Sequence, residues 1–354
     1  MDKLCSQILL DFQEYGLITA HQGADHRITD IKPVEFGGVG DLVFVEKEKY
    51  LAEAMANKVS AIITTTELAD KIDDKQIAVL TTPNVRMAMA HVRQKYVDRN
   101  LYHTEWPRVH PSSIIHNSVL VPEDAVIGPG VVIGADVLIG EKVVIMANSV
   151  IEQNVMIGTR TIIHPSCVVG YRCKIGSDVI LKSGCVIGSD GQGFAQDQDR
   201  RHHRIPQTGI VVIGDKAVIG ANCTIDRATY TETTVQSGTI IDAQCHLAHN
   251  VDIGEDCIIV AQSGIAGSSR LGKRVIVSGQ TGVLDHISVP DDTVLLHRAG
   301  LMSSIKKPGV YAGVPSQPLK KYLKNIAIFQ RLDEVWSRLK ALEKSLDKLH
   351  KNQN

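Results

Sequence analysis

The chain has few aromatic residues, almost no net charge and no long apolar run. Its 354 residues are 4% aromatic and carry a formal net charge of −1, with a pI near 6.9. Such a balance gives no reason to expect a nucleic-acid partner or a polybasic contact with a membrane. No apolar stretch approaches the ~20 residues of a transmembrane helix, and the amphipathic, partly acidic N-terminus is unlike a signal peptide. We therefore expect a soluble, cytoplasmic protein with no transmembrane segment.

The seven cysteines include no CxxC pair. Cys167, Cys173 and Cys185 share one six-residue register with Val179, which is typical of small residues that pack inside a repeat. We expect all seven to be reduced structural thiols, as in a cytosolic protein.

What the sequence does have is an aliphatic residue at every sixth position. The register begins at Val109 and continues through Ile115, Val121, Ile127, Ile133, Ile139, Ile145, Ile151, Ile157, Ile163, Val169, Ile175, Leu181 and Ile187. It resumes at Ile213, Ile219 and Ile225 and, after a slip between Ile225 and Val235, continues through Val235, Ile241, Leu247, Ile253, Ile259, Ile265, Leu271, Val277, Val283, Val289, Leu295 and Leu301. A period of six fits neither an α-helix nor an alternating strand. It predicts a solenoid of short strands, in which three six-residue faces close a triangular coil of about 18 residues.

Stacked coils of this kind satisfy their own backbone. Coils at the strand spacing of ~4.8 Å pair each N–H and C=O with the coil above or below. Glycine often follows the inward aliphatic residue, as at Gly134, Gly140 and Gly158, and we expect it there because turns between short strands need φ > 0. Since aliphatic residues fill the interior, we expect any chemistry on the outside, where two solenoids face each other.

Three zones divide the chain. Residues 1–105 mix apolar runs with helical patterns, which predicts a small α/β domain. The predicted strands are Leu42–Val45, Ala61–Thr64 and Ile77–Leu80, and the predicted helices are Lys3–Tyr15, Tyr50–Asn57 and Asn84–Tyr96. Residues 106–304 form the solenoid, with a polar insertion at Gly188–Val212 that we expect to cover a binding face.

Residues 305–354 form a C-terminal helical extension. Its apolar residues alternate in steps of four and three, which predicts a coiled-coil seam: Ile328, Leu332, Val335, Leu339, Leu342, Leu346 and Leu349. The seam fits packing on the protein's own helices and packing on neighbouring subunits equally well.

One outward histidine is a candidate general base. Leu247 is the inward residue of its repeat, so His249, two positions on, should point outward. A neutral imidazole suits general-base catalysis near neutral pH, although a surface histidine without a role fits the same pattern. Asp242 and His246 are close by in sequence and either orient the base or cap turns.

The repeat brings two further residues near His249. Gly267 follows by 18 residues, one coil or ~5 Å away, where its N–H can donate to an oxyanion. His286 follows by 37 residues, roughly 10 Å away. A zinc site is the alternative, but only two residues separate His246 from His249, so one of them would be misdirected, and zinc needs three convergent protein ligands. We expect no metal.

In the N-terminal zone, Phe44 and Tyr50 are six residues apart in a chain that is poor in aromatics. Two such rings can stack on a base, or they can pack the core of the small domain. The residues alone do not choose between these roles.

Several blocks of the sequence resemble the UDP-3-O-(3-hydroxyacyl)glucosamine N-acyltransferase family of lipid A synthesis. These blocks are GDLVFVEKEKY, RIPQTGIVVIGDKAVIGANCTIDRAT, CHLAHNVDIG, AQSGIAGSSRLGKRVIVSGQTGVLDH and KKPGVYAGVPSQP. The resemblance covers nearly the whole chain. It implies left-handed parallel β-helices that assemble as a homotrimer, with active sites in the clefts between subunits and no cofactor.

The resemblance also implies an activity: transfer of a 3-hydroxyacyl chain from acyl carrier protein to the 2-amino group of a UDP-3-O-acylglucosamine. His249 takes the place of the general base, Gly267 that of the oxyanion donor and His286 that of a second histidine at the site. Asp242 takes a position from which it orients or polarises His249. Phe44 and Tyr50 match aromatic residues that hold uracil, and the C-terminal helices match a region that helps to bind the carrier protein.

The chain departs from the usual family sequence at several positions. Lys47 and Glu48 replace an Asn-Pro pair in the uracil motif, His246 replaces a common glutamine, and Asp285 precedes His286 where glycine is usual.

A groove beside the solenoid near Leu301 and Met302 should set the length of the acyl chain. The competing enzyme class is a hexapeptide-repeat acetyltransferase that uses acetyl-CoA on a nucleotide sugar, and donor choice distinguishes the two. A purely structural solenoid is a third reading, but it does not explain the accessory N-terminal domain.

Overall fold

The computed structural model describes residues 1–312 and 319–351 and divides into two compact units, Met1–Leu101 and Tyr102–Asn354. In the first unit, a five-stranded sheet has the order β2-β7-β6-β5-β4. Its strands are β2 (Ala20–Gln22), β4 (Asp30–Ile31), β5 (Asp41–Val45), β6 (Ala61–Thr64) and β7 (Ala78–Thr81). Every residue of β6 and β7 is buried, as is typical of parallel strands that are covered on both faces. The predicted α/β character of this zone is confirmed.

Three helices of the first unit follow the prediction with small shifts at their ends, and the short helix at Thr66–Ala69 was not predicted. The helices are α1 (Cys5–Gln13), α2 (Leu51–Ala56), α3 (Thr66–Ala69) and α4 (Val85–Tyr96), with 3-10 turns η1 (Val34–Phe36) and η2 (Glu48–Tyr50). The first predicted helix is wrong at its start, because Lys3 and Leu4 instead form β1 (Lys3–Leu4), which pairs with β3 (Arg27–Ile28).

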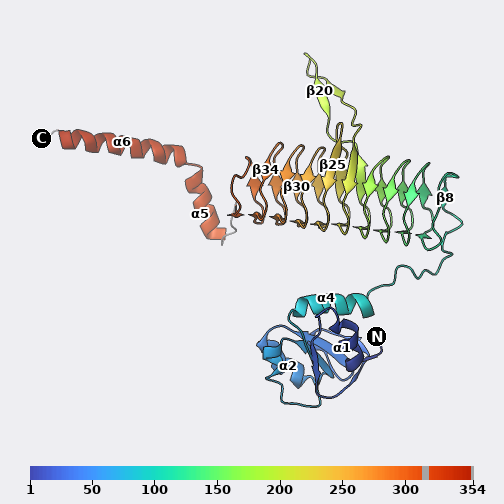
Figure 1. Ribbon diagram of the computed structural model, residues 1–354. Helices are drawn as coiled ribbons and strands as arrows, with labels where there is room; N and C mark the ends of the chain where they lie inside the picture. Colours follow the sequence, from blue (N-terminus) through green and yellow to red (C-terminus); the bar gives the residue numbers. More distant parts are fainter. Residues whose placement is uncertain (313–318, 352–354) are drawn as a thin grey trace. The chain divides into compact units, whose positions relative to one another are not determined.

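The second unit is a parallel β-helix of three sheets that follow one another around each coil (Figure 1). The first sheet contains β8 (Ile114–Ile115), β10 (Val132–Ile133), β13 (Val150–Ile151), β16 (Val168–Val169), β19 (Val186–Ser189), β24 (Thr224–Asp226), β27 (His246–Leu247), β30 (Gly264–Ile265), β33 (Gly282–Val283) and β36 (Gly300–Leu301). The second contains β11 (Leu138–Ile139), β14 (Met156–Ile157), β17 (Lys174–Ile175), β22 (Ile210–Ile213), β25 (Glu232–Val235), β28 (Asp252–Ile253), β31 (Arg270–Leu271) and β34 (Ser288–Val289). The third contains β9 (Val126–Ile127), β12 (Val144–Ile145), β15 (Ile162–Ile163), β18 (Ile180–Leu181), β23 (Val218–Ile219), β26 (Ile240–Ile241), β29 (Ile258–Ile259), β32 (Ile276–Val277), β35 (Val294–Leu295) and β37 (Val310–Tyr311).

The predicted fold of the solenoid is confirmed by its register. Val132 pairs with Val150, and Val150 with Val168, so successive coils are 18 residues apart. The second residue of each of these strands is the predicted inward aliphatic residue, and Ile151, Leu247 and Ile265 are examples with no exposed surface. The solenoid extends beyond the predicted end at residue 304, because β37 adds a last strand beside β35.

The cysteines pack as predicted. All seven are free and buried, and six lie in the solenoid. Burial raises the pKa of the Cys173 and Cys257 thiols above the ordinary value, which keeps them protonated and unreactive near neutral pH.

The glycine prediction is wrong in its reason. The left-handed residue of each corner comes two positions after such a glycine, at residues such as Asp136, Lys142 and Arg160, with φ of 56°, 53° and 60°. The glycine itself is needed for close approach, since a Cβ on Gly134 would lie 2.8 Å from the backbone nitrogen of Gln153 in the next coil. The Cβ clash between stacked coils, and not backbone conformation, selects glycine there.

The insertion is a β-hairpin that projects from one corner of the coil stack (Figure 1). Its strands are β20 (Phe194–Gln196) and β21 (His202–Arg204), which pair antiparallel. It leaves the solenoid after β19, in the first sheet, and returns at β22, in the second.

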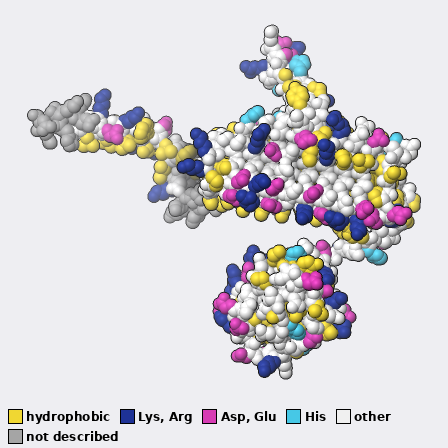
Figure 2. Space-filling view, viewed as in Figure 1, with side chains coloured by type: hydrophobic (Ala, Val, Ile, Leu, Met, Phe, Trp, Pro, Cys, Tyr) yellow, Lys and Arg dark blue, Asp and Glu magenta, His cyan; other side chains and the backbone are white. Residues whose placement is uncertain are grey.

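Two helices follow the solenoid in the chain, α5 (Leu319–Phe329) and α6 (Leu332–Lys351). The predicted seam is not continuous, because the helix breaks at Gln330 and Arg331, so that Ile328 lies in α5 and the other seam residues in α6. From Leu332 to Leu346 the seam residues are exposed, and hydrophobic side chains run along α6 in Figure 2. The last part of the KKPGVYAGVPSQP block, residues 313–318, lies outside the described residues.

Candidate active site

His249 lies at a corner of the solenoid, in the turn that joins β27 to β28. Leu247 ends β27 fully buried in the interior, so the chain turns outward directly after it. Asn250 takes the left-handed conformation of the corner, with φ of 59°, and its N–H donates to Thr233 Oγ1 at 2.9 Å. These constraints leave His249 half-buried on the outer surface.

Two glycines enclose the imidazole of His249. A Cβ on Gly267 would lie 2.8 Å from Cε1 and 3.0 Å from Nε2 of the ring. A Cβ on Gly191, in the insertion, would lie 2.9 Å from Cβ and 3.0 Å from Cδ2 of the same histidine. Any larger residue at either position would therefore displace the imidazole.

The backbone of Gly267 offers a free donor beside this ring. Its carbonyl accepts the N–H of His286 at 3.0 Å, and the next N–H, of Ser268, donates to the carbonyl of His249 at 3.0 Å. Across residues 1–312 and 319–351, no acceptor takes the N–H of Gly267. An uncommitted N–H next to an imidazole is the arrangement that stabilises a negative oxygen during acyl transfer.

Asn250 controls the protonation of the other ring nitrogen. Its Oδ1 accepts the N–H of Thr229 at 3.0 Å, and its Nδ2 lies 2.9 Å from Nδ1 of His249. In this orientation the amide donates to Nδ1, so the neutral ring carries its proton on Nε2. An imidazole that accepts a proton at Nε2 needs the reverse orientation, in which Oδ1 of Asn250 accepts a hydrogen bond from the N–H at Nδ1.

A buried carboxyl group lies next to this corner. Asp226 accepts a hydrogen bond from Ser189 Oγ at 2.7 Å, and its Oδ2 is 3.6 Å from His246 Nε2, while His246 Nδ1 is 2.7 Å from Thr224 Oγ1. Burial raises the pKa of Asp226 above its ordinary value, and the Ser189 hydroxyl and the positive charge that His246 and His249 carry when protonated oppose this shift. Asp226 is thus close enough to stabilise a proton on either imidazole.

The other predicted site residues are placed differently. Asp242 lies in the turn between β26 and β27, whereas His249 lies in the next turn, between β27 and β28. Asp242 Oδ1 accepts the N–H of Ala243 at 2.8 Å. Within one chain it therefore caps a turn and does not orient His249. His286 is exposed two coils beyond His249, with φ of 56°, and only its backbone contacts Gly267.

Met302 ends a row of outward side chains that grow in size away from His249. Its row begins at Ala248 and continues through Ala266 and Leu284, one residue per coil. Leu284 is 52% exposed and Met302 is 82% exposed. Beside this row, Gly264 and Gly282 present bare backbone, since a Cβ at either would meet nothing within 4 Å. The result is an open apolar track along the outside of the solenoid.

Phe44 and Tyr50 lie in the first unit and do not touch each other. Phe44, in β5, is half-buried against the core cluster that includes Ile63 and Leu80. Tyr50 packs against the cluster on the other side of the sheet, with Lys49 Nζ 4.5 Å from the centre of its ring. Each ring is partly buried against a core cluster and partly exposed. Core packing therefore explains only the buried part of each side chain.

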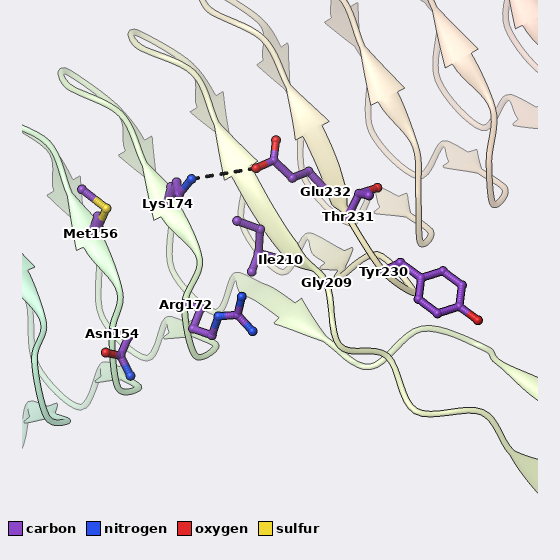
Figure 3. A pocket seen from close by; sticks show the side chains of 9 residues that line it. All are labelled: Asn154, Met156, Arg172, Lys174, Gly209, Ile210, Tyr230, Thr231 and Glu232. Atoms are coloured by element: carbon purple, nitrogen blue, oxygen red, sulfur yellow. Dashed lines mark ion pairs between the residues drawn. The ribbon is translucent and has the colours of Figure 1, made fainter.

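A pocket of about 880 Å³ is lined by residues from before and after the insertion (Figure 3). Arg172, Lys174 and Tyr230 line it, together with Glu232, whose Oε1 is 3.8 Å from Lys174 Nζ. None of the predicted catalytic residues contributes to its wall.

Several residues at the site were not identified from the sequence. Asn250 and Asp226 lie in two blocks that resemble the family, CHLAHNVDIG and TIDRAT. The position of Asn250 directly after an outward histidine could have identified it as a partner of the imidazole. Gly191 carried no signal, because it belongs to the insertion, where the six-residue register gives no position.

In the described part of the chain, no group of three His, Cys, Asp or Glu side chains is arranged to hold a metal ion. A zinc site would therefore need ligands from more than these residues. None of the described helices combines the length and apolar character needed to cross a membrane.

Three family profiles match separate parts of the chain. The one described as UDP-3-O-(3-hydroxymyristoyl) glucosamine N-acyltransferase, LpxD, matches residues 25–95. The bacterial transferase hexapeptide profile (six repeats) matches residues 232–267, and the GMPPB C-terminal domain profile matches residues 109–193.

Relatives with assigned activities extend this result to the whole length. A UDP-3-O-acylglucosamine N-acyltransferase from Methylococcus capsulatus is 58% identical over 97% of this chain and 98% of that protein. One of the same name from Idiomarina loihiensis is 51% identical over 45% of this chain and 47% of that protein. Among solved structures, the Francisella novicida UDP-N-acetylglucosamine acyltransferase matches with a TM-score of 0.44 and 22% identity, covering 64% of this chain and 78% of that one.

Proposed function

The chain belongs to the UDP-3-O-acylglucosamine N-acyltransferase family, and from that premise we propose that it transfers a 3-hydroxyacyl chain from acyl carrier protein to the 2-amino group of a UDP-3-O-(3-hydroxyacyl)glucosamine, a step of lipid A biosynthesis. The observation that carries the proposal is that the His249 imidazole lies against Gly267 of the next coil, whose N–H has no acceptor among the described residues. The first is a base for the proton of the attacking amine, and the second is a donor for the thioester oxygen.

The proposed reaction needs only these groups. The amine nitrogen attacks the thioester carbonyl carbon while Nε2 of His249 takes an amine proton, and the oxygen that becomes negative is held by the N–H of Gly267. The C–S bond then breaks, the amide forms, and the imidazolium returns its proton to the leaving thiolate. A thioester is already activated, so position, a base and an oxyanion donor are sufficient without a metal or cofactor.

Asn250 and Asp226 support the base in this scheme. Before His249 accepts a proton at Nε2, the amide of Asn250 turns so that its oxygen accepts a hydrogen bond from the N–H at Nδ1. The buried carboxylate of Asp226 then stabilises the imidazolium through space.

The open apolar track is the proposed site of the acyl chain. Alanines near His249 leave room for the carbons next to the thioester, and Met302, three coils or ~14 Å farther on, limits the length. The bare backbone at Gly264 and Gly282 allows a hydrocarbon chain to lie close to the sheet.

A homotrimer is supported by the third sheet. Its outward positions are aliphatic in every strand, and Ile240, Ile258 and Val310 are 46%, 41% and 68% exposed in one chain. An apolar column of this length requires a partner, and identical subunits around a symmetry axis provide one. In the trimer, a second subunit would bring Asp242 and His286 to the cleft that holds His249.

The first unit is the proposed site for uridine, through Phe44 or Tyr50, which are both only partly buried. A nucleotide-sugar acceptor and an acyl carrier donor are both found in the cytoplasm, where we place the reaction.

The experiment that tests the proposal mixes purified protein with 3-hydroxyacyl carrier proteins of several lengths and a UDP-3-O-acylglucosamine, and weighs the products by mass spectrometry. We expect one acyl amide per sugar. Product from acetyl-CoA, with none from the carrier protein, would identify a hexapeptide-repeat acetyltransferase instead.

A further inference from the structure

Arg227 is a fully buried cation whose one ion pair among the described residues is long. Its side chain is 1% exposed, and Asp190, the one acid paired with it, has an oxygen 3.8 Å from Nε. Burying a guanidinium is costly unless other groups satisfy its N–H donors. The partners of this arginine should therefore reveal why the chain keeps a charge there.

Those partners are carbonyl oxygens at the two ends of the insertion. Nε donates to Gly188 O at 2.7 Å, where the chain leaves the solenoid, and Nη1 donates to Gly209 O at 3.3 Å, where it returns. Nη2 donates to Tyr171 O at 3.3 Å, and the guanidinium carbon lies 3.6 Å from the centre of the Tyr171 ring. One planar group thus joins both necks of the hairpin to the preceding coil.

The backbone around the guanidinium is shaped for it. A Cβ on Gly170 would lie 2.8 Å from Arg227 Nη2, and one on Gly188, whose φ is 88°, would lie 2.5 Å from Cys173 Sγ. Side chains larger than glycine at these positions would crowd the buried guanidinium and the residues packed around it. Glycine at both positions therefore leaves the space in which the arginine is buried.

Both necks continue to His249. On the outgoing neck, Gly191 packs directly against the imidazole, as its 2.9 Å Cβ distance shows. On the returning neck, Gln207 Oε1 accepts from Thr229 Oγ1 at 3.0 Å, and Asn250 contacts both Thr229 and Nδ1 of the histidine. The two routes approach opposite sides of the same ring.

We infer that Arg227 is a positioning residue for His249: it does not touch substrate, but it fixes the two necks of the insertion that hold the imidazole in place. The inference rests on the proposed role of His249. Without the guanidinium, Gly188 and Gly209 lose their shared donor, the necks separate, and the ring loses its contact with Gly191 and its bond with Asn250.

The test compares Arg227→Met and Arg227→Lys with Arg200→Met, an exposed arginine of the same insertion, in the full-length protein. We expect Arg227→Met to lower kcat by about a hundred-fold, with KM for the sugar nearly unchanged, because a displacement of ~1 Å is enough for such a loss. Arg227→Lys should recover part of kcat, since an ammonium reaches one carbonyl but not both. Arg200→Met should match the parent.

A second measurement keeps the inference independent of turnover. The rate at which diethyl pyrocarbonate modifies His249, followed by peptide mass spectrometry, should rise several-fold in Arg227→Met and in Gly191→Ala but not in Arg200→Met. If Arg227→Met does not fold, Arg227→Lys decides the question, because it keeps the charge but reaches only one of the two carbonyls. An unchanged modification rate together with parental kcat would overturn the inference. An inactive parent, or a fully active His249→Ala, would instead refute the proposed function, and the modification rates would still report on Arg227.

Discussion

The outer surface of the first sheet changes at the insertion, whereas its inner surface does not. Before the insertion, the outward residues are Ile114, Val132, Val150, Val168 and Val186. After it, they are Thr224, His246, Gly264, Gly282 and Gly300. The inward residues stay aliphatic from Ile115 to Leu301. One surface therefore specifies how the chain winds, while the other is free to vary, and its variation marks the coils where chemistry is expected.

The strongest way to break this comparison is to remove His249. We expect His249→Ala to lower turnover by about 10²–10⁴, because a general base contributes about that much. The matched control is Gln153→Ala, which changes the same position of a corner turn before the insertion and should leave turnover unchanged. Turnover and the oligomeric state are both measured. Parental turnover in His249→Ala would remove the assignment.

Gly267 and Gly264 sharpen the comparison within one coil. Gly267→Ala places a Cβ 2.8 Å from His249 Cε1, and we expect at least a ~10²-fold loss of kcat, since the ring must move. Gly264→Ala meets nothing within 4 Å and should keep the parental melting temperature. Steady-state kinetics and calorimetry measure both effects. Equal kinetic losses in the two variants would contradict a specific role for Gly267.

The interior should respond alike on both sides of the insertion. Ile151 and Ile265 occupy equivalent inward positions of the first sheet and have no exposed surface. We expect Ile151→Ala and Ile265→Ala each to lower the free energy of unfolding by about 2–5 kcal/mol through cavity formation. Denaturant melts of the two variants provide the measurement. A loss confined to one of them would mean that the two halves do not share one core.

Met302 tests whether the outer surface after the insertion binds an acyl chain. In Met302→Trp we expect the product distribution to move toward shorter chains, with about a tenfold loss for the longest, since a blocked track excludes terminal carbons. Leu120→Trp, at the other end of the solenoid and 87% exposed, serves as the control. Competition between carrier-bound chains of several lengths gives the profile. A profile unchanged by Met302→Trp would argue against this track.

The smallest expected effect lies in the N-terminal unit, outside the repeat. The Tyr96 hydroxyl donates to Asp11, and this bond, with help from Lys95, holds the pKa of Asp11 below its ordinary value. A carboxyl whose pKa is depressed by folding stabilises the fold above its unfolded-state pKa of ~4, and that stabilisation disappears as pH falls through the folded-state pKa.

Tyr96→Phe should therefore lower the free energy of unfolding at pH 7 by well under ~1 kcal/mol, because the bond is partly exposed. The melting temperature should fall slightly at pH 7 and not at all near pH 2. Calorimetry at the two pH values is the measurement, with Tyr15→Phe as an exposed control. A difference that persists at pH 2 would show that the hydroxyl stabilises the fold independently of the charge on Asp11.

Much of the solenoid was predictable because its interior is strictly periodic. The inward register from Ile127 to Leu295 and the 18-residue coil both follow from spacing, and spacing also brings Gly267 beside His249. Spacing did not indicate the route of the insertion, so Gly191 and the role of Arg227 were not foreseen. The break in the helix at Gln330 was missed for a related reason, since seven-residue spacing constrains which face is apolar but not whether the backbone continues.

The 18-residue coil has a consequence for how this family can evolve. Removing or adding fewer than the 18 residues of a coil between His249 and Met302 would move every later side chain to a different position around the coil. Length changes in this stretch should therefore occur in whole coils. Each coil shifts the far end by about 4.8 Å, or about four carbons of an extended hydrocarbon. Coil number would then select acyl length in coarse steps, and single substitutions at the end of the row would provide the intermediate lengths.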